Sequence, residues 1–312
     1  MEATRLAFLC ISSSSLLWTL TSAIPKRVRS VGVKPSIERL VGNLSLVFNH
    51  QAGSTRLMRR QHHGPLLVQR PLYPEGSGCC HAIIVHPPGG IVGGDTLEID
   101  VCAEQNAHTL LSTPGAAKWY RANGQVARQQ VHLRGDADAS IEWLPQETIF
   151  FNQADVVLET QVSLHNSARF IGCEILCFGR TASGERFSQG QVKQTYKISV
   201  DDRLLWLEQG TLLADSASAN GPLGLSGYSV CASLLCVGAP SQRALIDEVR
   251  AAIAPWAEPH AKLGATQMKS LLMVRYLGDA SENARKVMLA AWRVLRPAML
   301  GRASTELRIW NT

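Results

Sequence analysis

The sequence has none of the short motifs by which most catalytic and zinc-binding sites are identified. Its eight cysteines include no Cys-x-x-Cys pair, which argues against zinc ribbons and zinc fingers. It also lacks a Gly-x-Ser-x-Gly nucleophile elbow, a His-Glu-x-x-His pair and any catalytic cysteine motif. These absences argue against an enzyme, and we predict a protein without catalytic residues.

Long runs of basic residues are absent too, although the 312-residue chain carries a formal net charge of +6. The longest basic patches are Lys26-Arg27 and Arg59-Arg60, without the interleaved aromatic residues of a nucleic-acid-binding stripe. The composition, 46% hydrophobic and 18% charged, is that of a globular protein with an ample core. We therefore expect no nucleic-acid partner.

An apolar stretch near the N-terminus, from Leu6 to Ala23, is interrupted by four serines and is too polar for a transmembrane helix. It ends in small residues that resemble a signal-peptide cleavage site, but the residues before it are nearly neutral. We expect residues 1–30 to be an N-terminal extension, as a start codon placed too early would produce, and residues 31–312 to form one domain. Secretion, with cleavage after Ala23, is the alternative. No membrane partner is expected.

The most distinctive segment is HPPGGIVGGD, residues 86–95. Its prolines fix φ and its glycines adopt backbone conformations closed to other residues, which predicts a tight loop between the strand-like segments 82–85 and 96–101. The loop lacks the Lys-Ser/Thr of a Walker sequence, and the strand-like pattern after it differs from the helix of a dinucleotide site. We expect this loop to be opened by His86, closed by Asp95 and shaped by Pro87, Pro88, Gly89, Gly90, Gly93 and Gly94.

Short alternating segments separated by turn residues dominate from about residue 38 to 235. In one of them Leu97, Ile99 and Val101 alternate with polar residues, which predicts one buried and one wet face. Asp201-Asp202 separates two further segments and predicts a hairpin. Because no helices intervene, the pattern predicts a mainly antiparallel β architecture.

Two helices are expected near the C-terminus, at about 241–254 and 281–296. Both segments carry apolar residues at helical spacing. Each would begin at a capping serine and stop at a proline, which are Ser241 and Pro255 in the first helix and Ser281 and Pro297 in the second.

Two glutamates fall where the pattern calls for apolar residues. Glu174 lies in 170–178, FIGCEILCF, which reads as a strand covered on both faces. A buried carboxylate needs a hydrogen bond, a cation, a proton or an internal water channel. An ion pair with Arg180 or another arginine is one solution, and a polar passage through the protein is the other. Glu142, between two apolar residues, makes a similar case.

Two further interpretations stay open. Cys79, Cys80, His81 and His86 form the one group dense enough to hold a soft metal such as Ni²⁺ or Zn²⁺, whereas most other cysteines are expected to be reduced core thiols. Alternatively, a secreted carbohydrate-active protein would use the buried carboxylates on a sugar. The sequence offers no sugar-stacking groove beyond the scattered Trp119, Trp143 and Trp206.

Several long blocks, in one order, resemble a known family. They are HPPGGIVGGD (86–95), LLSTPGAAKWYRA (110–122), EWLPQETIFF (142–151), GCEILCFGRTASGERF (172–187) and RIWNT (308–312). Together they resemble the urease accessory protein UreD, also called UreH, from about Gly64 to the C-terminus. One departure is Leu307, where the family usually has proline before the final arginine.

The resemblance implies a mainly β fold, a twisted β-helical stack of two sheets that is similar to a β-sandwich and bears a small helical element. It also implies a non-enzymatic, cytoplasmic maturation factor that binds urease apoprotein and UreF, and through UreF the GTPase UreG. Nickel would be transient cargo in an internal tunnel, with no tightly bound cofactor. Single carboxylates bind Ni²⁺ loosely, as a passage requires. We therefore hypothesise that Asp95, Glu142 and Glu174 line this passage, with His86 near one mouth.

Overall fold

The computed structural model describes residues 39–238 and 243–311, which belong to the unit Arg39–Thr312. The expectations for residues 1–30, and the proposed helix cap Ser241, fall outside the described residues and stay predictions. Among the described helices, none combines the length and apolar character needed to cross a membrane.

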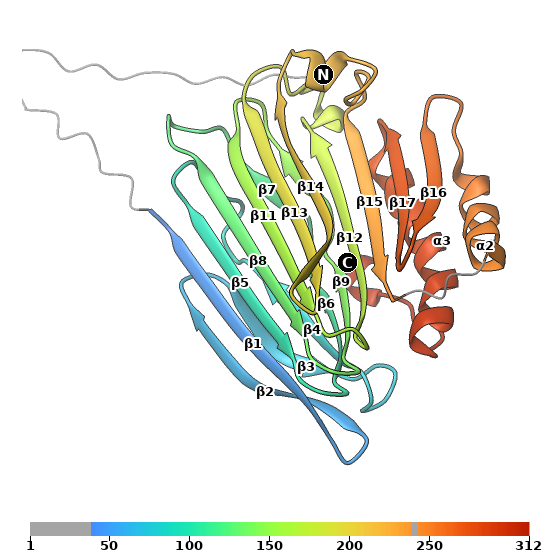
Figure 1. Cartoon of the computed structure of the whole chain (residues 1–312). Coiled ribbons are helices and arrows are strands. Elements are labelled where there is room, and N and C mark those ends of the chain that lie inside the picture. Colours follow the sequence, from blue (N-terminus) through green and yellow to red (C-terminus); the bar gives the residue numbers. More distant parts are fainter. Residues whose placement is uncertain (1–38, 239–242, 312) are drawn as a thin grey trace, which may run out of the picture. The chain divides into compact units, whose positions relative to one another are not determined.

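Two β-sheets pack face to face around the main hydrophobic core (Figure 1). In spatial order, the seven-stranded sheet consists of β14 (Arg203–Leu213), β13 (Gln191–Val200), β11 (Asp155–Leu164), β8 (Ala127–Gly135), β5 (Thr96–Ala103), β1 (Val41–Gln51) and β2 (Ser54–His63). The ten-stranded sheet has the order β16 (Lys262–Met268), β17 (Leu271–Gly278), β15 (Val230–Val237), β12 (Arg169–Phe178), β9 (Ser140–Leu144), β6 (His108–Ser112), β4 (Cys80–Val85) and β3 (Leu67–Leu72), with β10 (Thr148–Phe150) beside β12 and β7 (Ala117–Trp119) beside β10.

Parallel pairing dominates the middle of both sheets. In the first sheet β1, β5, β8, β11 and β13 are successive parallel neighbours, and in the second β4, β6, β9 and β12 are. From β5 to β13 the chain passes back and forth between the sheets, as in a solenoid. This confirms the two-sheet β-helical stack. The mainly antiparallel prediction was wrong, because alternation along a strand reports which face is buried and not the direction of its neighbour.

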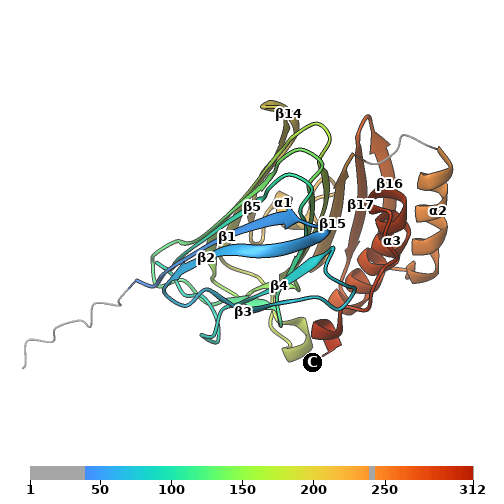
Figure 2. The same cartoon turned by 90° about the horizontal axis from the view of Figure 1, so that it is seen from below.

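The ten-stranded sheet is covered on both faces, as Figure 2 shows from below. One face meets the seven-stranded sheet, and the other is covered by α2 (Arg243–Ile253) and α3 (Ser281–Leu300). On β12, Phe170, Leu176 and Phe178 enter the core between the sheets, whereas Ile171 and Cys173 enter the core beneath the helices. The prediction that this strand is covered on both faces is confirmed. The remaining short helices are α1 (Ala217–Asn220), η1 (Thr181–Ser183), η2 (Ala254–Trp256) and η3 (Arg308–Asn311).

Both predicted C-terminal helices form, and the second differs from its prediction at both ends. Helix α2 ends at Ile253, two residues before Pro255, as expected. Helix α3 has Ala280 as its N-cap in place of Ser281 and continues through Pro297 to Leu300. Tertiary packing overrides the proline, because Leu295 and Met299 on either side of it are buried.

The hairpin predicted at Asp201-Asp202 joins the antiparallel strands β13 and β14. Both aspartates have positive φ, as the tight hairpin turn demands. Strands β16 and β17, between α2 and α3, extend the second sheet beyond the region where the sequence pattern indicated strands.

Candidate functional site

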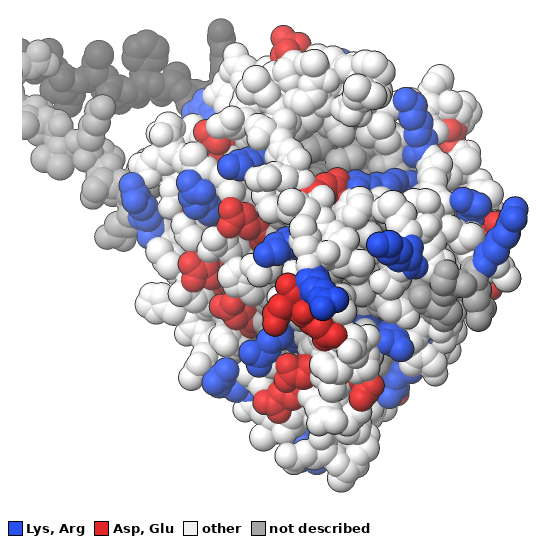
Figure 3. All heavy atoms as spheres, viewed as in Figure 1, with Lys and Arg blue, Asp and Glu red and all other residues white. Residues whose placement is uncertain are grey.

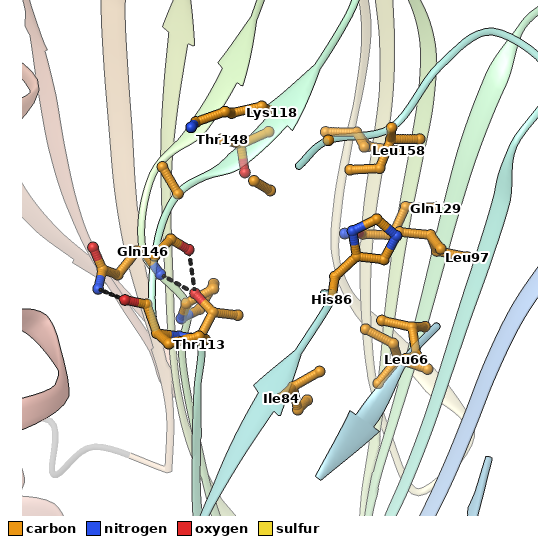
Figure 4. Close-up of a pocket in the computed structure, with 18 of the residues that line it drawn as sticks. Leu66, Ile84, His86, Leu97, Thr113, Lys118, Gln129, Gln146, Thr148 and Leu158 are labelled. Carbon is orange, nitrogen blue, oxygen red and sulfur yellow. Dashed lines mark hydrogen bonds between the residues drawn. The ribbon is translucent and has the colours of Figure 1, made fainter. Parts of the chain in front are cut away.

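A cavity of about 200 Å³ lies between the two sheets. Figure 4 shows His86, Leu97 and Gln129 on one side of it and Thr113, Gln146 and Thr148 on the other. Apolar strand residues form much of the wall, and polar side chains interrupt it at separate points. The polar lining residues include His86, Thr113, Lys118, Gln129, Gln146, Thr148, Thr160 and Glu174.

The loop 86–95 forms one wall of this cavity, and the close approach of its backbone explains its glycines. The Ile91 N–H donates to the Lys118 carbonyl at 2.8 Å, which ties the loop to β7. A Cβ on Gly90 would lie 2.4 Å from the Tyr120 ring and 2.8 Å from the Lys118 carbonyl oxygen. The loop therefore fits its place only with glycine at residue 90.

Asp95 closes the loop, as predicted, and its side-chain carboxylate binds backbone N–H groups of neighbouring residues. Its buried carboxylate accepts hydrogen bonds from the N–H groups of Val92, at 2.9 Å, and Leu40, at 3.1 Å. Asp95 is absent from the cavity lining. The structure thus gives Asp95 the role of holding the loop against the start of β1.

His86 does reach the cavity. Its side chain is half-buried, and its Nε2 atom is buried without a hydrogen-bond partner. Burial lowers the pKa of His86, against the opposing effects of a hydrogen bond that the imidazole donates to the Pro88 backbone carbonyl and of the charge of Asp95. A neutral imidazole with an unengaged ring nitrogen is a metal-ligating or hydrogen-bonding group.

Glu174 faces the same cavity from β12. Its Oε2 accepts a hydrogen bond of 2.7 Å from Nε2 of Gln194, on β13 of the opposite sheet. Burial, and then the charge of Glu208, raise the pKa of Glu174 to about 7, against the effects of Gln194 and Arg275. The predicted ion pair with Arg180 does not form, because the Arg180 guanidinium binds Glu185.

A second hollow, of about 610 Å³, lies beside the cavity, and we call it the cleft. Leu176 lines both hollows. Gln194 lines the cleft while its partner Glu174 lines the cavity. The hydrogen bond between Gln194 and Glu174 therefore crosses the boundary between the two hollows.

Glu142 lies on the opposite face of the ten-stranded sheet, beneath α3. It is fully buried and accepts hydrogen bonds from His108 Nε2 and Trp292 Nε1, both at 2.7 Å. Arg296 adds an ion pair with an Nε–Oε2 distance of 3.0 Å. Burial raises the pKa of Glu142, but the hydrogen bond and charge of His108 and the charge of Arg296 together hold it below the usual value. Glu142 and Glu174 thus face different compartments and do not converge as a carboxylate pair on one sugar.

Arg296 extends the Glu142 network to the segment before β4. Its Nη2 contacts Oε1 of Glu75 at 2.7 Å, and that oxygen also contacts His81 Nε2 at 2.6 Å. Burial raises the pKa of Glu75, but His81 and Arg296 outweigh it and lower the pKa to about 2. Two carboxylates thus share one fully buried guanidinium.

The four residues of the predicted metal cluster do not converge. Cys79 lies under the helices with His81, Cys80 enters the core between the sheets, and His86 lines the cavity. The potential ligand groups that the structure assembles among the described residues are Glu75, Cys79 and His81, and Cys79, His108 and Glu142. Arg296 already supplies the positive charge that both carboxylates need, and burial raises the pKa of the Cys79 thiol. These donors fit a structural ion network better than a metal site.

Sequence reasoning missed four residues of this network, namely Glu75, His108, Trp292 and Arg296. Trp292 and Arg296 are four positions apart on the buried face of α3, and a charged residue on an apolar helical face is the signal that points to them.

The fold and cavity define a two-sheet β protein with a partly polar compartment between its sheets. A family model described as "UreD urease accessory protein" matches residues 41–311, and the chain belongs to this family. Curated relatives agree. The chain is 56% identical over 269 residues to "Urease accessory protein UreD" from Janthinobacterium sp. (strain Marseille), covering 86% of this chain and 90% of that protein. It is 48% identical over 273 residues to the protein of the same name from Nitrosospira multiformis, covering 88% and 98% respectively.

Proposed function

We propose that this chain is a non-catalytic urease maturation factor that binds urease apoprotein in the cytoplasm and helps deliver nickel to its active site. The observation that carries the proposal is membership of the UreD family across residues 41–311. UreF and, through UreF, the GTPase UreG are its further partners. Nickel is the cargo of this process and not a resident cofactor.

The proposed route for nickel runs between the two sheets, through the cavity and the cleft. His86 offers an unengaged ring nitrogen in the cavity, and Glu174 offers a carboxylate at the boundary between cavity and cleft. Isolated ligands of this kind hold Ni²⁺ weakly, so the ion can move on. Asp95 and Glu142 act in the proposal as structural residues, because backbone N–H groups hold the first and Trp292 and Arg296 hold the second.

Co-purification tests the partners. The tagged chain is co-expressed with the urease subunits, alone and together with UreF and UreG, and then isolated by its tag. We expect urease subunits and UreF to co-purify with it, and UreG to join only when UreF is present. Recovery of the folded chain without urease subunits in every combination would overturn the proposal.

A further inference from the structure

A charge pair joins the two sheets at the cleft. Arg275 on β17 donates from Nη1 and Nη2 to the two carboxylate oxygens of Glu208 on β14, at 2.9 and 2.5 Å. Both residues line the cleft, and their side chains are 41% and 36% exposed. Figure 3 views this side of the molecule, where acidic and basic side chains lie beside a hollow in the surface. The pair is therefore in contact with both solvent and the cleft.

The strand register places this pair in line with Glu174. Glu174 is opposite Ser233 on β15, and Ser233 is opposite Arg275 on β17. Directly opposed residues of antiparallel strands point to the same face, so all three point toward the seven-stranded sheet. Arg275 is two strands from Glu174, a separation of about 10 Å between strand axes.

The facing sheet repeats this arrangement. Gln194, the partner of Glu174, is opposite Gly210 on β14, and Glu208 lies two residues before Gly210 on the same face of that strand. Two cross-sheet contacts thus follow one another from the interior outward, first Gln194 to Glu174 and then Arg275 to Glu208. The outer contact joins two ionisable side chains, whereas in the inner contact only Glu174 is ionisable.

Electrostatic coupling between the two contacts gives the outer one a means to act on the inner one. Burial is the largest cause of the raised pKa of Glu174, and the carboxylate of Glu208 raises it further. The guanidinium of Arg275 lowers it. A cation that enters by the cleft approaches the guanidinium of Arg275 before it reaches Glu174. Repulsion from that guanidinium opposes entry, and Glu208 offsets the repulsion.

We propose that Arg275 and Glu208 form a charge gate at the cleft end of the nickel route, a role that rests on the proposed function. With the pair closed, its charges cancel and its side chains lie across the cleft. When the guanidinium moves away, the Glu208 carboxylate becomes a second weak oxygen ligand beyond Glu174. Arg275 sets the barrier to cation entry, and Glu208 sets how far that barrier is lowered.

Opposite effects of two neutralising substitutions test the gate. The assay is the rate of urease activation by the full chain with its partners at limiting Ni²⁺. Arg275→Gln removes the barrier and is expected to raise the rate about threefold. Glu208→Gln leaves the positive charge of Arg275 without its partner and is expected to lower the rate about threefold. A pair that merely ties the sheets together would lower the rate in both variants.

A double variant and a surface pair complete the design. Glu208→Gln combined with Arg275→Gln is expected to return to at least the wild-type rate, because no unbalanced cation remains. Lys286→Gln and Glu282→Gln, which break a solvent-exposed pair on α3, are expected to change nothing. The double variant also decides the matter if one single variant melts early, since a rate below that of wild type in the double variant would contradict the gate.

Glu174→Gln in the same assay separates the two proposals. An unchanged rate in Glu174→Gln would contradict the nickel route itself. A reduced rate there, with Arg275→Gln and Glu208→Gln changing in the same direction or not at all, would overturn the gate and leave the route standing.

Discussion

Gln194 and Glu174 belong to different sheets, and a hydrogen bond of 2.7 Å joins them at the boundary between the cavity and the cleft. The glutamate lies among apolar residues of β12, on the face toward the other sheet. A carboxylate there is costly to bury, and an amide donor offsets only part of that cost. Glu174 therefore lowers the stability of the fold, and the proposed nickel route gives this glutamate a function.

The first prediction concerns nickel delivery. Glu174→Gln keeps the size of the side chain and an oxygen that can accept the hydrogen bond from Gln194, but it removes the negative charge that attracts a cation. We expect urease activation to fall by about threefold or more at limiting Ni²⁺, with the melting temperature maintained or raised. Glu98→Gln, on the outer face of the seven-stranded sheet, is the matched control. Equal activation by Glu174→Gln and wild type would contradict the role of Glu174.

The second prediction concerns pH. The pKa of Glu174 is raised to about 7 in the folded protein, so its stabilising contribution is full below the unfolded value and is lost as pH rises through 7. As pH rises from 5 to 8, the free energy of unfolding of wild type should therefore fall relative to that of Glu174→Gln by about 1–3 kcal/mol. Urea unfolding at both pH values measures this. A difference between the two proteins that does not change with pH would show that Glu174 titrates normally.

The third prediction concerns the fully buried Arg296. Arg296→Met leaves Glu142 and Glu75 without their shared cation, and we expect a loss of about 3–5 kcal/mol of folding free energy. Lys286→Met is the matched control, because it breaks a solvent-exposed ion pair on the same helix and should have little effect. Chemical denaturation compares the two variants, and similar losses in both would refute a special role for the network.

The fourth prediction concerns acid stability. Glu75 has its pKa lowered to about 2, so the stability it contributes is present above pH 4.5 and is lost as pH falls toward 2. Glu75→Gln should be less stable than wild type at neutral pH by about 2–3 kcal/mol. The difference should narrow on acidification. Unfolding curves from pH 6 down to pH 3 measure it, and a constant gap would contradict the assignment.

The fifth prediction concerns the glycine-rich loop. Gly90→Ala forces a Cβ against the Tyr120 ring and the Lys118 carbonyl, and we expect the free energy of unfolding to fall by about 1–3 kcal/mol. Gly89→Ala has space, since its nearest contact would be the Tyr120 hydroxyl at 3.7 Å, and it should be tolerated. Thermal melts of both variants provide the comparison. Equal stability of the two would mean that the loop relaxes around the added methyl group.

The two-sheet stack could be expected from the sequence through its family resemblance, but strand direction could not be expected from pattern alone. Alternation of Leu97, Ile99 and Val101 identifies the buried face of β5 correctly. It carries no information on whether the neighbouring strands run parallel, because that depends on where the chain goes after each strand. The resemblance supplied this missing part.

The candidate site was predicted in part, for a similar physical reason. Glu174 could be recognised as inward-facing from the apolar run around it. The same reasoning placed Glu142 inside but missed its partners, because Trp292 and Arg296 lie 150 and 154 residues away. Burial is a local property of a strand, whereas the compartment that a side chain enters depends on the packing of distant elements.

The most direct test of the central claim is to express the urease subunits with UreF and UreG, with and without this chain, at limiting Ni²⁺. Urease activity and nickel bound per active site are measured on the purified enzyme. We predict that both are high only when the chain is present. Fully active, nickel-loaded urease in its absence would contradict the account.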